Sequence, residues 1–396
     1  MTQLETLIQT LCPNGVKFVK LGEVGEFENI GVDKKSNANE QKVTLLNYVD
    51  IYKNKYIDAS IPSMVVTAPD KKITQCNVLQ YDIFVTPTSE TRDDIGHAAV
   101  VLEDLPNVVY SYHIMRFRLE EPNIDTAKFI RYLFETPIIQ KQIYKAAKGL
   151  TRFGLSKYQF AELQIPLPPL AVQSEIVRIL DKFTLYKSEL AAELVARLQQ
   201  YEYYREQLLT FDDSVKRVKL GEVAELKAGS FVSRTELKDC SINGFPCYGG
   251  NGIRGYANHY SHEGSFSIIG RQGALCGCVH YATGKFYATE HAVVVKTKES
   301  VLSKYLYYVL VHANLNQYKS QGAQPGLAIS NLNQLVFPIP SLEFQERIVS
   351  ILDRFDKLCH DIREGLPAEI ELRQKQYEHY RDKLLTFTDI IGYKNS

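Results

Sequence analysis

Long apolar runs and a regular set of cysteines, two marks of many membrane and secreted proteins, are missing from this sequence. No stretch of its 396 residues approaches the ~20 apolar residues of a membrane-spanning helix, so we predict no membrane span. The first residues, MTQLETLIQTL, include an acid and no basic segment, which argues against a signal peptide. The seven cysteines are odd in number and scattered, which favours a reducing cytoplasm over a disulfide framework.

An excess of either charge is also missing. The chain has 46 basic and 46 acidic residues, so its formal net charge is zero. This balance neither supports nor excludes binding to nucleic acid, which depends on where charge collects. The composition, 45% hydrophobic and 23% charged, is that of a soluble globular protein, and a chain of this length should form two or three domains.

Sequence motifs of enzyme cofactors are absent too. We find no glycine-rich strand–turn–helix segment for a dinucleotide or adenosyl cofactor, no P-loop lysine, and no Asn/Asp-Pro-Pro-aromatic motif of an amino-methyltransferase. Asp70 with Glu90 and Arg92 could be assembled into a nuclease-like site, but the usual lysine is missing and the spacing is loose. We therefore predict no catalytic residue in this chain.

A metal site is one interpretation of the segment around Cys276, Cys278 and His280. Their spacing of i, i+2 and i+4 is typical of one face of a strand, and differs from the C-x₂-C spacing of a zinc site. The possible further ligands are Cys240, Cys247 and His291. We favour a buried strand with cysteines as small apolar residues, and predict no metal site.

The dominant feature is a segment that occurs twice, at residues 165–211 and 337–387. Both copies begin with x-P-x-P, continue through Q-x-x-I-V-x-I-L-D-[KR]-F and end on Q-Y-E-x-Y-R-x-x-L-L-T-F. In the first copy, apolar residues recur at steps of four and three, which predicts a long helix with an a/d seam, roughly 60 Å in length. The seam consists of Ile176, Leu180, Phe183, Leu190, Leu194, Tyr201, Tyr204 and Leu208.

The second copy repeats this seam but has four more residues in its middle. Four residues is the insertion that preserves a seam, although Gly365 and Pro367 predict a break or kink there. Its seam consists of Ile348, Leu352, Phe355, Ile362, Tyr377, Tyr380 and Leu384. We expect the two helices to pack antiparallel on each other about a pseudo-twofold axis; the alternative is two unrelated surface helices.

A second, shorter repeat shows that the duplication includes the regions between the helices. VKFVKLGEVGEF at 16–27 and VKRVKLGEVAEL at 215–226 each begin a β-rich region that is otherwise dissimilar between the copies. We predict an α+β fold of two β-rich heads and two long helices. The expected segments are 1–164 (first head), 165–211 (helix), 212–336 (second head), 337–391 (helix) and 392–396 (tail).

Strands are predicted by β-rich runs between glycine, asparagine and proline turns. In each head a helix, at 126–147 or 303–318, follows the strands and leads to a glycine-bearing loop, AAKGLTRFGLS or YKSQGAQPGLAIS. The expected strands are 42–51, 83–85, 98–102 and 108–119 in the first head and 266–269, 277–281 and 288–296 in the second.

Side chains suited to nucleic acid are concentrated in the heads. The first head has an acid-free basic run at the end of its helix, although lysine there also complements the helix dipole. In the second head, Arg, Asn and Gln, which can bond base edges, lie among glycines that allow close approach of the backbone. The candidates are Arg92, Lys141, Lys145, Lys148, Arg152, Lys157, Arg254, Tyr256, Asn258, His259, Arg271, Gln272 and Gln324.

The duplicated helices, the C-P-N-G-V segment at 12–16 and the two V-K-x-V-K-L-G-E-V segments resemble the specificity (S) subunits of type I restriction–modification systems over the whole chain. The resemblance implies two target-recognition domains, each reading half of a split double-stranded DNA site, and a helical spacer between them. It implies that this subunit binds no cofactor: two modification subunits carry S-adenosylmethionine and methylate adenine, and restriction subunits use ATP and Mg. The segment SELAAEL at 188–194 is similar to a four-residue spacer repeat of the family.

The Y-E-x-Y-R segments near the helix ends are candidates for docking the modification subunits. Tyrosine and arginine are enriched at interfaces, but the tyrosines at 201, 204, 377 and 380 also fall on the seam. We therefore predict core positions for the tyrosines and interface positions for Glu202, Arg205, Glu378 and Arg381. The competing functions are a coiled-coil scaffold with two protein-binding heads, a stand-alone methyltransferase, which the missing cofactor motif opposes, and the specificity subunit of a methyltransferase-only system.

Overall fold

The computed structural model describes residues 3–35, 37–239, 244–273, 275–320, 325–361 and 363–390. The chain divides into two compact units, one of residues 1–189 with 371–396 and one of residues 190–370. Each unit combines one β-rich head with part of the long helices, so its limits differ from the segment boundaries expected at 164, 211 and 336. Those segment boundaries stay a prediction about the sequence repeat.

The two repeated motifs of each head meet in a short antiparallel strand pair. In the first head β1 (Phe18–Lys20) pairs with β13 (Gln164–Pro166), and Val19 is opposite Ile165. In the second head β14 (Arg217–Lys219) pairs with β21 (Val336–Pro338) in the same register, with Val218 opposite Phe337. The V-K-L-G and x-P-x-P motifs therefore recur together because they bring the start and the end of each head side by side.

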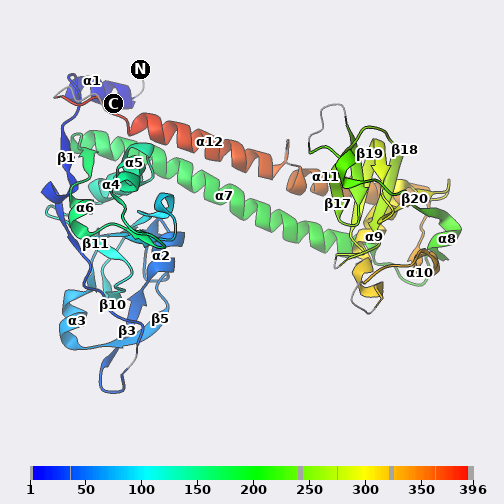
Figure 1. The fold of residues 1–396 in the computed structure, drawn as a ribbon, viewed down its shortest axis with the longest axis horizontal. Helices are drawn as coiled ribbons and strands as arrows, with labels where there is room; N and C mark the ends of the chain where they lie inside the picture. Colours follow the sequence, from blue (N-terminus) through cyan, green and yellow to red (C-terminus); the bar gives the residue numbers. More distant parts are fainter. Residues whose placement is uncertain are drawn as a thin grey trace. The chain divides into compact units, whose positions relative to one another are not determined.

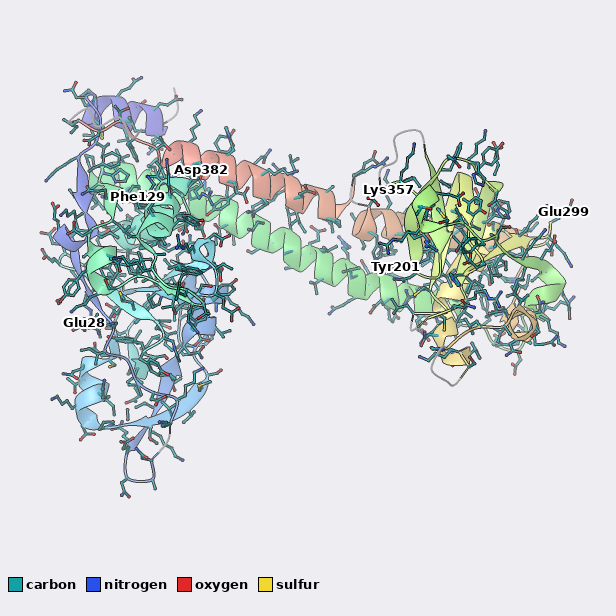
Figure 2. The ribbon with its side chains drawn as sticks, viewed as in Figure 1. Glu28, Phe129, Tyr201, Glu299, Lys357 and Asp382 are labelled. Carbon is teal, nitrogen blue, oxygen red and sulfur yellow. The ribbon has the colours of Figure 1, made fainter. Side chains whose placement is uncertain are left out.

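The first head is built on two sheets. A five-stranded sheet has the order β2-β11-β7-β9-β4, and a four-stranded sheet has the order β5-β3-β10-β6. Phe129, labelled in Figure 2, is fully buried in the core that the five-stranded sheet shares with the helices. The strands are β2 (Gly25–Glu28), β3 (Gln41–Leu46), β4 (Tyr56–Ile57), β5 (Met64–Ala68), β6 (Asn77–Val78), β7 (Ile83–Val85), β9 (Ala98–Val101), β10 (Leu105–Tyr110) and β11 (Met115–Leu119).

Three predicted elements of this head are broken by local signals. The strand expected at 42–51 ends at Leu46, because Asn47 caps α2 (Tyr48–Lys53) through its side chain. The strand expected at 108–119 is two strands joined by a turn. The helix expected at 126–147 is α4 (Ile124–Phe134) followed by α5 (Pro137–Ala146), which Thr136 caps and Pro137 begins.

The second head is built on one six-stranded sheet with the order β15-β20-β18-β19-β16-β17. The predicted strand at 266–269 lies within β18, but β19 begins only at Val279, so Cys276 and Cys278 lie in the turn before it and not on a strand face. The expected helix 303–318 is α9 (Ser303–His312) and the 3₁₀ turn η4 (Leu315–Tyr318), separated at Asn314. The strands are β15 (Ala224–Ala228), β16 (Phe245–Gly249), β17 (Gly252–Ala257), β18 (His262–Gly270), β19 (Val279–Ala288) and β20 (Ala292–Thr297).

The predicted long helix is α7 (Leu170–Leu209), a single helix of 40 residues that contributes to both units (Figure 1). In the first unit its early part packs antiparallel on α12 (Leu366–Leu384), where Phe183 stacks on Tyr380 at 5.5 Å between ring centres. In the second unit its late part packs antiparallel on α11 (Leu342–His360), where Tyr204 stacks on Phe355 at 5.5 Å. The predicted α+β fold with an antiparallel seam is thus confirmed.

The predicted break in the second long segment is also confirmed. Helix α11 ends at His360 and α12 begins at Leu366, while the seam residue Ile362 lies outside the described residues. A Cβ at Gly365 would come within 2.5 Å of the Lys357 carbonyl oxygen and 2.7 Å of the Asp361 carbonyl oxygen. The turn between the helices therefore has no room for a side chain at this position.

Each head is tied to the helices by the same ion pair, which we call the aspartate clamp. In the first unit the Asp181 carboxylate of α7 accepts hydrogen bonds from Lys128 Nζ at 2.7 Å and from Tyr132 OH at 2.6 Å, both on α4. In the second unit Asp353 of α11 accepts from Tyr308 OH at 2.5 Å and lies 3.6 Å from Lys304 Nζ, both on α9. The clamp residues occupy matching positions of the repeat, because both aspartates belong to I-L-D-[KR]-F.

Replacing Gly365 with alanine should lower the free energy of unfolding by about 1–3 kcal/mol, because the new Cβ meets backbone oxygens that cannot move aside as a side chain would. Chemical denaturation of the purified chain measures the change. Glu364→Ala, an exposed neighbour, is the control and should change stability by less than ~0.5 kcal/mol. Equal stability of the two variants would contradict the tight turn.

Candidate nucleic-acid interface

Both heads contain a paired loop with the same backbone hydrogen bonds. In the first head β8 (Thr88–Ser89) pairs with β12 (Phe153–Gly154), and Leu155 N donates to the Pro87 carbonyl at 3.0 Å. In the second head Gln272 is bridged to Gly326, and Leu327 N donates to the Arg271 carbonyl at 2.8 Å. In each case the glycine-bearing loop, which follows α5 in the first head and η4 in the second, is held against a loop of the sheet.

Five of the thirteen predicted DNA-contacting residues lie at or beside the paired loops, three in the first head and two in the second. In the first head, the turn η2 (Arg92–Asp94) follows β8, while Lys148 and Arg152 are exposed in the partner loop. In the second head Arg271 and Gln272 lie on the side of the paired loop that corresponds to Pro87 and β8 in the first head. Gln324 falls outside the described residues. The structure therefore gives the two heads a common loop framework with different side chains.

Aromatic rings and a hydroxyl position the arginines of the first head. The Arg92 guanidinium lies over the Phe153 ring at 4.8 Å and the Tyr144 ring at 5.7 Å. Arg152 Nε donates to Thr88 Oγ1 at 3.2 Å across the paired loop. Cation–π contacts of this kind orient a guanidinium while it keeps its charge and its other donors for a ligand.

A polar cluster beside this loop was missed in the sequence because its residues are far apart along the chain. Asp94 Oδ1 lies 2.9 Å from His97 Nε2 and accepts from Tyr52 OH at 3.3 Å, and the Tyr52 and His97 rings are 4.4 Å apart. Burial raises the pKa of the Asp94 carboxyl, but hydrogen bonds from His97 and Ser89 outweigh it, so the pKa is lowered. Burial lowers the pKa of His113, and the positive charges of Lys34 and Arg152 lower it further.

The lysines earlier in α5 lie in a different place. Lys141 and Lys145 line a hollow of about 390 Å³ together with Phe18 and Gln164 of the β1–β13 pair. Gln142 next to them donates to the Gln164 carbonyl at 3.0 Å. The contiguous basic run 141–157 is thus split between two surfaces, and the residues next to the paired loop are Lys148 and Arg152.

In the second head the predicted residues separate into two groups. Arg254 of β17 lies against Gly249, where a Cβ would come within 3.0 Å of Arg254 Cδ, and Gly250 is similarly close to the Gln272 carbonyl oxygen. This glycine-lined group also includes Arg271, whose backbone N–H donates to the His291 backbone carbonyl at 2.9 Å. Tyr256 lies near the end of β17, and Asn258 and His259 follow the strand, where the His259 ring meets the Tyr287 ring edge-on at 4.9 Å.

The glycine-lined group contains polar residues that the sequence analysis did not select as DNA-binding. His291 Nε2 lies 3.2 Å from Glu290 Oε1 in the turn between β19 and β20. Burial lowers the pKa of His280, whose ring lies against Gly252. The buried side-chain atoms here that have no hydrogen-bond partner among the described residues are Arg271 Nε, His280 Nε2, Glu290 Oε2 and His291 Nδ1. The sequence contains no signal for these residues, because a glutamate and a histidine in one turn match no binding motif.

The predicted docking residues differ in how they are held. Glu202 and Glu378 are exposed, whereas the Arg205 and Arg381 guanidinium groups lie over the rings of Tyr201 and Tyr377, at 5.3 and 5.7 Å. The Arg381 side chain is only 13% exposed and donates from Nε to Asp382 at 2.8 Å. The Arg381 guanidinium also lies 3.9 Å from the Glu135 carboxylate, which accounts for its low exposure, and its role in docking stays a prediction.

The tyrosines of these segments also divide into two kinds. Tyr201 and Tyr377 are buried, as predicted for the seam. Tyr204 and Tyr380 are 39% and 43% exposed, so a core position was wrong for them. Each stacks one ring face on a phenylalanine of the partner helix and leaves its other side in solvent, as expected at the edge of a helix pair.

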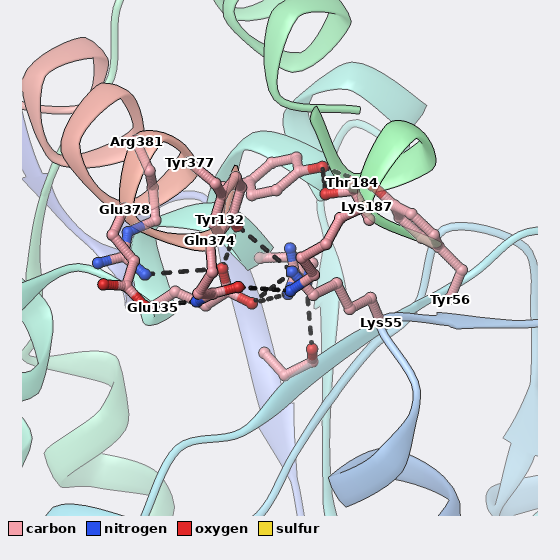
Figure 3. Close-up of polar contacts among 12 residues, drawn as sticks. Lys55, Tyr56, Tyr132, Glu135, Thr184, Lys187, Gln374, Tyr377, Glu378 and Arg381 are labelled. Carbon is pink, nitrogen blue, oxygen red and sulfur yellow. Dashed lines mark hydrogen bonds and ion pairs between the residues drawn. The ribbon is translucent and has the colours of Figure 1, made fainter. Parts of the chain in front are cut away.

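A buried ionic network joins the first head to α12 (Figure 3). Lys55 Nζ lies 3.2 Å from Glu135 Oε1 and donates to Tyr377 OH at 3.3 Å, and Tyr377 OH donates to Glu135. Burial raises the pKa of Glu135, but Arg131 and Lys55 outweigh it and lower the pKa to about 2. Burial and the nearby Arg131 lower the pKa of Lys55 to about 8.

This network predicts acid sensitivity of the first unit. Because the Glu135 pKa falls from 4.5 unfolded to about 2 folded, its stabilisation is present above pH 4.5 and is lost as the pH falls toward 2. Glu135→Gln should lower the free energy of unfolding by on the order of 3 kcal/mol near neutral pH. The difference from the natural chain should shrink as the pH falls from 4.5 toward 2. Denaturation curves at several pH values measure it.

Glu162→Gln is the matched control, because Glu162 pairs with Lys20 at the surface and such pairs contribute little. A Glu135→Gln effect that does not change between pH 4.5 and 2 would contradict the role given to this carboxylate.

Comparison with known proteins identifies the family. The family model of the type I restriction modification DNA specificity domain matches residues 13–200 and 213–372, which together are most of the chain. The chain therefore belongs to the type I restriction–modification specificity family. The described part of the chain has no group of three metal-binding side chains. None of its helices has the length and apolar character needed to cross a membrane.

Curated relatives resemble parts of the chain. The specificity subunit of the Escherichia coli type I enzyme EcoprrI is 49% identical over 208 residues, 50% of this chain and 52% of that protein. The EcoR124I/EcoR124II specificity subunit of Escherichia coli is 36% identical over 265 residues, 60% of this chain and 66% of that protein. The chain thus matches between half and two thirds of the length of these relatives.

Solved structures share the fold along nearly the whole chain. An S subunit of a type I restriction–modification system from M. genitalium has a TM-score of 0.58 and 16% identity, covering 94% of this chain and 96% of that one. A chain from work on complex assembly and conformational transition of the type I R-M system has a TM-score of 0.54 and 18% identity, covering 94% and 97%. At these identities the likeness establishes the fold.

Proposed function

We propose that this chain is the DNA-recognition subunit of a type I restriction–modification complex, with each head reading one half of a split double-stranded site. The observation that carries the proposal is the paired loop, which recurs with the same backbone hydrogen bonds but different side chains in the two heads. A common framework with different exposed residues suits two readers of different sequences, because backbone bonds hold each loop whatever bases its side chains read.

The side chains suggest a division of work. Lys148 and Arg152 are exposed cations on the loop of the first head and suit phosphate contacts, which give affinity without sequence information. Arg254, Arg271 and Gln272 lie among glycines that allow a base edge to come close, and Arg and Gln can bond guanine and adenine bidentately.

Catalysis and cofactors belong, in this proposal, to partner subunits. Two modification subunits would bind S-adenosylmethionine and methylate adenine, and restriction subunits would supply ATP- and Mg-dependent cleavage. The docking residues we propose are Glu202 and Arg205 in one unit and Glu378 and Arg381 in the other. The described cysteines are unpaired, which suits a reducing cytoplasm.

Substitutions in the two kinds of contact should have different effects. Arg254→Ala and Arg271→Ala should each weaken the free energy of binding to the cognate site by about 1–3 kcal/mol. Each should also relax base specificity at one position of a single half-site. Lys148→Ala and Arg152→Ala should weaken binding to all duplexes and lower the salt slope by about one each. Methylation-site mapping with the modification subunit and salt-dependent duplex binding measure these effects.

Lys285→Ala, an exposed lysine of β19, is the control and should leave both motif and salt slope near those of the natural chain. An unchanged methylated motif and rate in both arginine variants would show that other residues read the second half-site. No salt-dependent binding to duplex DNA would instead favour the scaffold function.

The length of α7 should set the gap between the half-sites. Inserting Ala-Ala-Glu-Leu after Leu194 keeps the seam and lengthens the helix by ~6 Å. One base-pair step is ~3.4 Å and DNA can twist at some elastic cost, so we expect the unspecified gap to grow by about one or two base pairs. The half-site sequences should stay the same.

The control places the same four residues after Asp213, beyond the end of α7 at Leu209. This insertion should leave the gap unchanged. Methylation mapping that finds changed half-site bases, or the natural gap, in the Leu194 insertion would show that α7 does not set the spacing.

A further inference from the structure

Besides the shared backbone pairings, the aspartate clamp is a side-chain contact that both heads make with a long helix. In both heads the tyrosine is four positions after the lysine, as in Lys128 and Tyr132 on α4 and in Lys304 and Tyr308 on α9. Residues four apart lie on one face of a helix, so both side chains of a pair reach the same carboxylate. A shared K-x-x-x-Y in otherwise dissimilar heads indicates that this contact does the same task twice.

We propose that the clamp residues set the angle of each head on its helix, and through it the gap length that the complex accepts. The inference rests on the proposed function and adds residues outside both the DNA faces and the spacer repeat. Apolar packing between head and helix is non-directional, whereas a tyrosine hydrogen bond and a lysine ion pair from one helix face to one carboxylate restrict rotation and sliding. A head that can swing would place its reading loops over a range of positions along DNA.

The geometry makes the first clamp the stronger one. Besides Lys128 and Tyr132, Asp181 accepts a hydrogen bond from Tyr56 OH, which comes from β4 of the five-stranded sheet. The carboxylate is thus held by the sheet as well as by α4. Burial raises the pKa of Asp181, but bonds from Lys128, Tyr132 and Tyr56 outweigh it and lower the pKa, so the carboxylate is charged near neutral pH.

The second clamp relies on fewer bonds to its carboxylate. Asp353 has Tyr308 as its close donor, with Lys304 Nζ at 3.6 Å. Lys304 is instead surrounded by rings, 4.4 Å from the centre of Tyr281 and 4.7 Å from that of Tyr307. Loss of one donor should therefore loosen the second head more than the first. Loss of the carboxylate should instead loosen the first head more, because more donors bind it there.

The test is methylation-site mapping of a host that carries the full chain with its modification subunit. Tyr132→Phe and Tyr308→Phe keep the packed ring and remove only the donor, and Asp181→Asn removes the charge. We expect unchanged half-site bases and a rise of roughly tenfold in methylation at sites whose gap is one base pair longer or shorter, largest for Asp181→Asn.

A matched pair of lysine substitutions separates positioning from general stability. Lys128→Met should broaden the accepted gap and Lys128→Arg, which keeps a charged donor, should not. Lys182→Met removes an exposed lysine next to Asp181 and is the control. Thermal unfolding of each variant records any loss of stability alongside the gap distribution.

The outcomes are distinct. A broader gap distribution with the natural half-site bases supports the positioning role. Variants whose total methylation falls while the gap distribution stays that of the natural chain would overturn it, since the clamp would then serve folding alone. If the natural chain directs no methylation with its modification subunit, the proposed function itself fails, and that result is visible before any variant is made.

Discussion

The organisation of this protein depends on α7 and α11 each meeting one helix of a head, α4 or α9, through one aspartate. Asp181 and Asp353 are only partly exposed, so each carboxylate needs partners to offset the loss of water. Lysine and tyrosine supply them from one helix face, and removal of either side would leave a charge uncompensated. Around this contact the apolar residues of the helices and heads form continuous cores, with Ile176 and Leu180 in one unit and Ile348 and Leu352 in the other.

The duplicated frame and the variable faces are maintained by different kinds of interaction. The frame uses the seam and the aspartate clamp, both of which require particular residues at particular positions. The faces are held by backbone hydrogen bonds, such as those from Leu155 and Leu327, which do not depend on the side chains that the loops display. Residues such as Arg92 and Arg271 could therefore diverge between the heads without loss of the fold.

The two units differ in how the head meets the seam tyrosine. In the first unit Arg131 stands three residues after Lys128 and forms an ion pair with Glu135, beside Lys55 and Tyr377. At the matching position the second unit has Tyr307, which packs at 5.4 Å from the Tyr281 ring. The contact between head and helix is thus ionic and pH-dependent in the first unit. In the second unit it is aromatic and depends on apolar burial.

Local pattern was enough to predict the repeat, the long helix, its antiparallel seam and the break near Gly365, because periodic apolar residues and glycine or proline act over a few residues. Element limits failed where a single cap decided them, as at Asn47 and Thr136. Of the candidate DNA-contacting residues, Arg92, Lys148 and Arg152 lie at the paired loop of the first head, and Arg271 and Gln272 lie at that of the second. Their contact with DNA stays a prediction.

Tertiary structure alone placed Tyr52 beside Asp94 and Glu290 beside the glycines of the second head, because strand pairing between distant segments leaves no local pattern. It also turned Arg381 inward, since the direction of a long side chain is decided by the charges it can reach after folding.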